Sequence, residues 1–222
     1  AAMPYFPEAQ TLTLVGCWLE NEAVSQFREA HREDYKVVWS VNINGLVVRT
    51  DDTYFMPAKH HKVVTNFQVQ KLKYCEDMIC IDVGHKPLET CEFVRYMPNL
   101  KYLILAWTEV QYIEPIRTCK NLVFLELDNS CIRDISPLVD CTALEDLNLG
   151  NTYADFAPVG EMTWLKNLWM IGCSTGARYR MTNALPDTKV MVTGSATVAN
   201  SWRNLDNYYA MRDLLGMHYM SW

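Results

Sequence analysis

The sequence lacks the features that would place the protein in a membrane or on nucleic acid. No apolar run approaches the roughly 18 residues that a membrane-spanning helix needs. Acidic residues outnumber basic ones by 26 to 20, which gives a formal net charge of −6. A nucleic-acid-binding face requires an excess of Lys and Arg, and so does attraction to anionic lipid. We therefore expect neither nucleic acid as a partner nor insertion into a membrane.

Motifs for catalysis and metal binding are also absent. The sequence contains no G-x-S-x-G, no Walker A and no G-x-G-x-x-G. Its histidines include the adjacent pair His60 and His61, but none falls in a zinc-binding spacing, and we interpret that pair as solvated. The acidic residues form no recognisable catalytic pair. We therefore expect no catalytic site, no metal and no cofactor, and predict that the protein is not an enzyme.

What the sequence does contain is an internal repeat of 22 residues. Counting Leu122 as position 0, apolar residues fill positions 3, 5, 10, 13 and 16. The members of that repeat are Leu125, Leu127, Ile132, Ile135 and Leu138. The preceding repeat has Leu103, Leu105, Val110, Ile113 and Ile116, and the one before has Ile81, Val83, Leu88, Cys91 and Val94. Regular repeats start at residues 78, 100, 122, 144 and 165, and such a period is typical of a solenoid.

The spacing within one repeat predicts its local structure. Positions 3 and 5 lie on one face of a short strand, because side chains alternate along a strand. Positions 10, 13 and 16 step by three residues, which favours a 3₁₀-like return segment. Small polar residues recur at position 8, as Thr108, Ser130 and Thr152, where they could bond to the backbone. One unit cannot bury its own apolar side, whereas stacked copies form a parallel sheet with a continuous core.

The pattern LxxLxLxx(N/T/S/C)xIxDIxPLxxCxxL, most complete from Leu122, resembles the leucine-rich repeat family. It is most similar to the short 22-residue class typified by bacterial internalins. The resemblance implies an α/β solenoid: a horseshoe with a parallel sheet on its concave face and 3₁₀ or turn segments on its convex face. It also implies a bacterial, exported or cell-surface protein that binds a protein or peptide. Residues 1–4 have no leader-like features, so a leader would have preceded this sequence.

We expect one structural domain with a cap at each end of the repeats. Residues 1–50 form an N-terminal cap with a first repeat-like unit, in which Leu12 and Leu14 take positions 3 and 5. A helix is expected over 21–33 with Asn21 as its N-cap, followed by a hairpin that turns at Asn44 and Gly45. Residues 196–222 form a C-terminal helical cap, with a helix over 204–215 and an apolar tail that we expect to be docked.

The repeats occupy residues 51–195 and include two irregular units. The first spans residues 51–77, with Tyr54 and Met56 at positions 3 and 5, and its extra residues must bulge near 57–61. The last loses the pattern over 174–180, and Val190 and Val192 are expected to supply a final strand.

The cysteines follow the same repeat. Cys75, Cys119 and Cys141 share one position, which Met97 and Met162 fill elsewhere. A position shared by Cys and Met indicates an apolar core column. We therefore expect buried free thiols there, because parallel neighbours give poor disulfide geometry. Outside this column, Cys17, Cys91 and Cys173 are interpreted as structural, and Cys80 and Cys131 are expected to be exposed.

The strand residues that alternate with the core should face the concave side. They combine aromatic and acidic side chains, a composition found at protein interfaces, and the carboxylates favour a basic partner. The predicted ligand-binding residues are Asp82, Tyr102, Ile104, Phe124, Glu126, Asp128, Asp146, Asn148 and Trp169.

Other readings of this face stay open. Another element of the chain could cover these aromatic side chains, or they could stack with each other. A second function is a structural spacer within a larger surface protein. A third, less favoured, is a hydrolase that uses carboxylates of the concave face.

Overall fold

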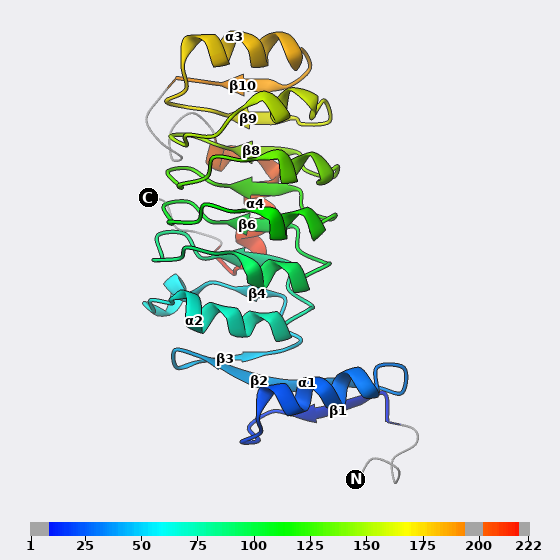
Figure 1. The fold of residues 1–222 in the computed structure, drawn as a ribbon. Coiled ribbons are helices and arrows are strands. Elements are labelled where there is room, and N and C mark those ends of the chain that lie inside the picture. Colours follow the sequence, from blue (N-terminus) through cyan, green and yellow to red (C-terminus); the bar gives the residue numbers. More distant parts are fainter. Residues whose placement is uncertain (1–8, 194–201, 218–222) are drawn as a thin grey trace.

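A parallel sheet of seven strands runs along the repeat region of the molecule (Figure 1). The computed structural model describes residues 9–193 and 202–217. Each strand pairs with the next one along the chain, so sequence order is also spatial order. The strands are β4 (Tyr54–Phe55), β5 (Cys80–Asp82), β6 (Tyr102–Ile104), β7 (Phe124–Glu126), β8 (Asp146–Asn148), β9 (Asn167–Trp169) and β10 (Lys189–Met191).

The return segments are short helices stacked along one side of the sheet (Figure 1). The 3₁₀ helices occur where the steps of three residues predict them. They are η2 (Pro57–His60), η3 (Gln70–Tyr74), η4 (Glu92–Tyr96), η5 (Glu114–Thr118), η6 (Ser136–Asp140) and η7 (Ala157–Glu161), with the α-helical turn α2 (Asn66–Val69) before η3. The predicted solenoid with a parallel sheet and a 3₁₀ convex side is confirmed.

The predicted register is confirmed in the regular repeats. Leu103, Leu125, Leu147 and Leu168 are opposite one another on neighbouring strands, and each is fully buried. Position 8 closes the turn after the strand, as its small polar residues predict. The hydroxyls of Thr108, Ser130 and Thr152 donate to the carbonyl oxygens of position 5 at 2.7, 2.6 and 2.8 Å, respectively. Each bond satisfies a buried acceptor that the sheet leaves free.

The cysteine column is buried and free of disulfides. The Sγ atoms of Cys119 and Cys141 lie 3.6 and 3.4 Å from carbonyl oxygens of the preceding repeat. Burial raises the pKa of the Cys119 thiol to about 12. Cys131 is exposed as predicted, but the prediction for Cys80 is wrong, because the other face of the sheet is covered at that point. Cys17 is exposed.

The N-terminal elements form a separate sheet of three strands, β1 (Thr11–Leu14), β2 (Lys36–Ile43) and β3 (Leu46–Arg49). The hairpin between β2 and β3 turns at Asn44 and Gly45, whose φ values of 52° and 83° suit that pair. Strand β1 pairs with β2, so Leu12 and Leu14 do not begin the seven-stranded sheet. The prediction of Asn21 as N-cap is wrong, because helix α1 (Asn21–Ala30) follows Glu20 as its N-cap and ends three residues earlier than expected. The Asn21 side chain accepts a bond from Trp39 Nε1.

In the first irregular repeat the expected register is wrong by one residue. Phe55, not Tyr54, is opposite Ile81 and fills the core, and Tyr54 is opposite Cys80. Since successive strand residues point to opposite faces, this slip places Met56 on the concave side. The extra residues form η2 at the expected place.

The last irregular repeat contains a helix that the sequence pattern did not predict. Helix α3 (Thr175–Ala184) begins at Ser174, whose Oγ accepts a bond from the amide of Ala177 at 3.2 Å. It replaces the 3₁₀ segment of the other repeats and buries Ala177 and Met181. The expected final strand is present as β10, in which Val190 is opposite Leu168.

The C-terminal helix lies elsewhere than predicted. Helix α4 (Asp206–Leu214) follows the short η8 (Trp202–Asn204), and Gly216 ends it with a φ of 64°. It does not close the end of the solenoid. It lies across the sheet on the side opposite the 3₁₀ helices, behind the strands in Figure 1. The predicted docked tail after Met217 lies outside the described residues. In the described parts of the chain, no helix has the length and apolar character that a membrane span requires.

The repeat core yields a direct test of the register. We expect Leu125→Asp to abolish cooperative unfolding, because it places an unpaired carboxylate in a fully buried site. Gln111→Asp introduces the same side chain at an exposed position and should change the free energy of unfolding by no more than about 0.5 kcal/mol. Urea unfolding followed by circular dichroism compares the two, and equal effects would contradict the register.

Candidate functional site

The concave face of the sheet is covered by residues 202–217, which we call the cover segment. The predicted binding residues Tyr102, Ile104, Phe124, Glu126, Asp128, Asp146, Asn148 and Trp169 are all buried, and Asp82 is half-buried. The expectation that these side chains face solvent is therefore wrong. The alternative that another element covers them is correct, and their role in binding a ligand stays a prediction.

Trp202 is the anchor of the cover segment. Its side chain is fully buried between Phe124 and Trp169, with ring centroids 4.8 and 5.2 Å away. The indole Nε1 donates to Glu126 Oε2 at 2.9 Å. The site thus binds the indole through a tilted contact with Phe124, an edge-on contact with Trp169 and a hydrogen bond to its single polar atom, and a buried tryptophan needs such a partner for its N–H.

Helix α4 continues this contact along the concave face. We call the part of that face beneath the cover segment the groove. Tyr208, Met211 and Leu215 are buried on one side of the helix, at a spacing that suits one helical face. Tyr209 points away from the sheet and is about half exposed. The insertion after β4 holds the far end, because Lys59 Nζ donates to the carbonyl oxygen of Leu215 at 3.0 Å. A cation is favourable at a helix C-terminus.

Polar contacts fix the cover segment at the start of β8. Asn207 Nδ2 donates to Asp146 Oδ2 at 3.0 Å and lies 3.2 Å from Glu145 Oε2. The other oxygen of Asp146 accepts a bond from Asn167 Nδ2 at 2.7 Å. Sequence reasoning identified Asp146 but missed Asn207 and Lys59, whose roles depend on where α4 docks.

Burial changes the acidity of the concave carboxyl groups. Desolvation raises the pKa of Glu126 from its ordinary value of 4.5 to about 7, against the hydrogen bond from Trp202. Desolvation also raises the pKa values of Asp82, Asp128 and Asp146. The positive charge of Arg203, in the cover segment, favours the ionised forms of Asp82 and Glu126.

Two buried donors on this face have no hydrogen-bond partner among residues 9–193 and 202–217. They are Nδ2 of Asn148 and Nε1 of Trp169, which belong to residues directly opposite each other on β8 and β9. An unsatisfied buried donor costs about 1–3 kcal/mol. The cover segment therefore fits the apolar part of the face better than its polar part.

One edge of the groove is a row of residues at position 7. His85, Trp107, Asn129 and Asn151 all have positive φ values of 52° to 57°. Trp107 is half exposed and stacks on His85 at 5.6 Å. A left-handed backbone is uncommon for a bulky aromatic residue. Asn129 and Asn151 donate to Asp128 at 2.7 and 3.2 Å, so the amide side chains support this edge.

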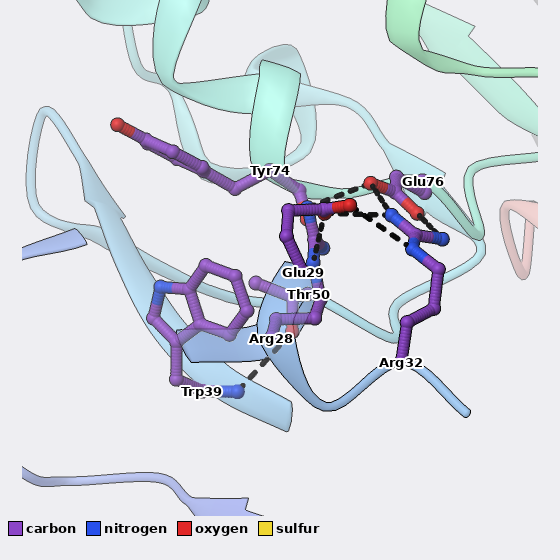
Figure 2. Close-up of polar contacts among 7 residues, drawn as sticks. All are labelled: Arg28, Glu29, Arg32, Trp39, Thr50, Tyr74 and Glu76. Atoms are coloured by element: carbon purple, nitrogen blue, oxygen red, sulfur yellow. Dashed lines mark hydrogen bonds and ion pairs between the residues drawn. The ribbon is translucent and has the colours of Figure 1, made fainter. Parts of the chain in front are cut away.

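A second polar cluster lies between helix α1 and the first repeats (Figure 2). Arg28 and Arg32 both bind Glu76, at 2.6 and 3.0 Å, and Arg32 also binds Glu29. Arg28 further donates to the carbonyl oxygen of Tyr74 and lies 5.0 Å from the centre of the Trp39 ring. An adjoining cavity of about 290 Å³ is lined in part by these arginines. Since both cations already have carboxylate partners, we interpret the cluster as the attachment of α1 to the solenoid.

Neither surface has the ligands of a metal centre. In residues 9–193 and 202–217, no group of three or more His, Cys, Asp or Glu side chains could hold an ion. The pair His60 and His61 is exposed, as expected.

The two tryptophans of the groove should respond differently to the loss of their N–H groups. Trp202→Phe leaves the buried Glu126 carboxyl without its donor. We therefore expect the free energy that holds the cover segment on the sheet to fall by about 1–3 kcal/mol. Trp169→Phe costs packing in the same cluster but removes a donor that has no partner among the described residues, so its loss should be smaller than that of Trp202→Phe. Hydrogen exchange of the α4 amides measures both effects locally. A larger loss for Trp169→Phe would contradict the assigned contacts.

Closure of the groove should weaken as the pH rises. Glu126 retains its proton in the covered state up to about pH 7, whereas an exposed carboxyl ionises near 4.5. Between these values, a rising pH favours the uncovered form, on the order of 1 kcal/mol per pH unit. Glu126→Gln keeps an acceptor for Trp202 but does not titrate. Exchange of the α4 amides between pH 5 and 7.5 should therefore depend less on pH in that variant, after correction for intrinsic exchange. Equal pH dependence in the two proteins would exclude this role for Glu126.

Comparison with known proteins places the fold. No protein-family model and no curated protein matches the sequence. Among solved structures, an LRR protein of Leptospira interrogans is similar with a TM-score of 0.52 and 19% identity, over 58% of this chain and 34% of that one. An internalin and internalin C2 of Listeria monocytogenes give TM-scores of 0.43 and 0.41 at 16% and 18% identity. They match 62% and 63% of this chain, which spans 49% and 73% of theirs. By its repeat and its structure, the chain has the leucine-rich repeat fold.

Proposed function

We propose that the protein is a non-catalytic scaffold that binds a protein or peptide on the concave face of its sheet. One observation carries the proposal: this face already holds a peptide segment, residues 202–217 of the same chain. The contact uses an aromatic anchor, an apolar helix face and directed hydrogen bonds. These are the means by which a groove recognises an amphipathic helix.

Binding of another molecule requires the cover segment to move, and its structure makes this feasible. Helix α4 has nine residues, and a helix of that length depends on its tertiary contacts. Without the cover, the sheet would expose Tyr102, Ile104 and Phe124 on the neighbouring strands β6 and β7, and Trp169 two strands farther along on β9. An apolar patch of this kind, bordered by carboxylates and amides, is typical of a binding surface.

Two alternatives predict different behaviour. In a structural spacer, the cover segment is a permanent layer and the groove never binds another molecule. A hydrolase would need accessible carboxylates in a cleft. The concave carboxyl groups are desolvated, but Glu126 and Asp146 accept bonds from Trp202 and Asn207 of the cover segment. This arrangement supports binding over catalysis.

The proposal extends to location. The 22-residue repeat resembles that of bacterial internalins, and we propose an exported or cell-surface bacterial protein. A leader upstream of Ala1 in the complete reading frame would support this, and a reading frame that starts without one would exclude export by that route.

Selection from a random-peptide display library tests the binding function. The first bait is the full chain with Trp202→Ala, which removes the anchor of the cover segment. The second bait carries Trp202→Ala together with Phe124→Ala, which also removes an aromatic wall of the groove. We expect the first bait to enrich peptides with a shared motif, and the second bait to bind those peptides at least about tenfold more weakly, a difference of 1.4 kcal/mol.

Both baits must first show cooperative unfolding, so that a negative result reflects binding and not misfolding. Enriched peptides that bind both baits equally would place the site outside the groove. A folded first bait that enriches no motif would favour the spacer.

A further inference from the structure

The cover segment shows which ligand the groove is built to accept. We infer that the groove is a receptor for a tryptophan-anchored amphipathic helix of a second protein, and that residues 202–217 compete with that helix from within the chain. This inference rests on the proposed function and specifies its ligand. It depends on how Trp202, Arg203 and the buried face of α4 meet the sheet.

The anchor subsite is specific for an indole. Phe124 and Trp169 contact its ring, and Glu126 accepts its N–H at 2.9 Å. A phenylalanine would fill the same space but leave the carboxyl group without a donor, and a site built around a buried hydrogen bond discriminates strongly against a ligand that lacks it. The ligand therefore needs tryptophan at its anchor.

The residues that follow the anchor define the rest of the ligand. Arg203 comes directly after Trp202, and its charge stabilises the carboxylates of Asp82 and Glu126. Tyr208, Met211 and Leu215 then place three apolar groups on one helical face. A competing helix would carry tryptophan, a basic residue next to it, and apolar residues at a matching spacing.

The same surface contains a feature that the cover segment does not use. Nδ2 of Asn148 and Nε1 of Trp169 are buried, belong to residues opposite each other on β8 and β9, and have no acceptor in the part of the chain that the structure describes. A ligand that offers a carbonyl or carboxylate oxygen at this point would gain bonds that the internal segment lacks. The groove can therefore prefer an external helix over its own segment, which is the condition for displacement.

Attachment to the same chain gives the cover segment an advantage over any free ligand. A tethered segment acts at an effective concentration of about millimolar. The apparent affinity of an external helix is its intrinsic affinity multiplied by the fraction of molecules in which the groove is open. Loosening the cover segment should therefore increase affinity for an external helix, and this provides the test.

The probe is a fluorescein-labelled synthetic peptide with the sequence of residues 202–217, and binding is measured by fluorescence anisotropy. The targets are the full chain, the full chain with Trp202→Ala, and the full chain with Met211→Ala. The second variant loosens the cover segment by shortening a buried side chain of α4, and it leaves the groove residues unchanged, so the peptide keeps all of its own contacts. We expect the peptide to bind each folded variant at least about tenfold more tightly than the wild-type chain.

Two control peptides test the chemistry of recognition. A Trp202→Phe peptide should lose at least about tenfold in affinity, because it cannot donate to Glu126, and an Arg203→Glu peptide should also bind more weakly. Equal affinity of the three peptides, or of the peptide for all three proteins, would overturn the inference. A folded Trp202→Ala chain that binds no peptide would overturn the inference too. So would a released cover segment that binds only the groove of a second copy of this chain, giving a dimer. If the inference fails in this way but the display experiment enriches a motif without tryptophan, the proposed binding function is still supported and only the identity of the ligand is wrong.

Discussion

The structure depends on one constraint: a parallel sheet whose strands are apolar on both faces must be covered on both faces. On one face, Leu125 and the equivalent residues of the other repeats pack against the 3₁₀ helices and form a continuous core. On the other side of the same strands, Tyr102, Phe124 and Trp169 form a second cluster with Trp202 and Tyr208. The cover segment is thus the element that allows aromatic residues at positions 2 and 4 without exposing them to water.

This constraint explains which parts of the molecule the sequence could predict. The residues at positions 3, 5, 8, 10, 13 and 16 interact with the same positions of neighbouring repeats, so their pattern alone predicts the sheet, the return turns and the hydroxyl bonds of Thr108 and Ser130. Asn44 and Gly45 fix their hairpin locally. The one-residue shift at Phe55 could not be read, because residues 51–77 have no equal-length neighbour to align with.

The candidate site was only half predictable for the same reason. The alternation of side chains identified the concave residues of the regular repeats, including Glu126 and Trp169, but it missed Met56 and did not show what lies over this face. The apolar helix spacing after Leu205 indicated a docked helix. Nothing in the pattern of this helix showed whether it docks at the end of the solenoid or on the concave face. Its docking place depends on contacts between residues more than 70 positions apart, such as Trp202 with Glu126, and repeat periodicity carries no information about such pairs.

The polar atoms beneath the cover segment argue that this layer is not optimised for permanence. A core evolved only for stability would satisfy or replace its buried polar groups. Among the described residues, the side-chain donors of Asn148 and Trp169 have no partner, and desolvation raises the pKa of the Glu126 carboxyl to about 7. Those costs oppose the burial of Trp202 and the apolar face of α4, so they narrow the free-energy gap between covered and open states. A groove with a small gap of this kind can exchange one helix for another, whereas a fully satisfied core cannot.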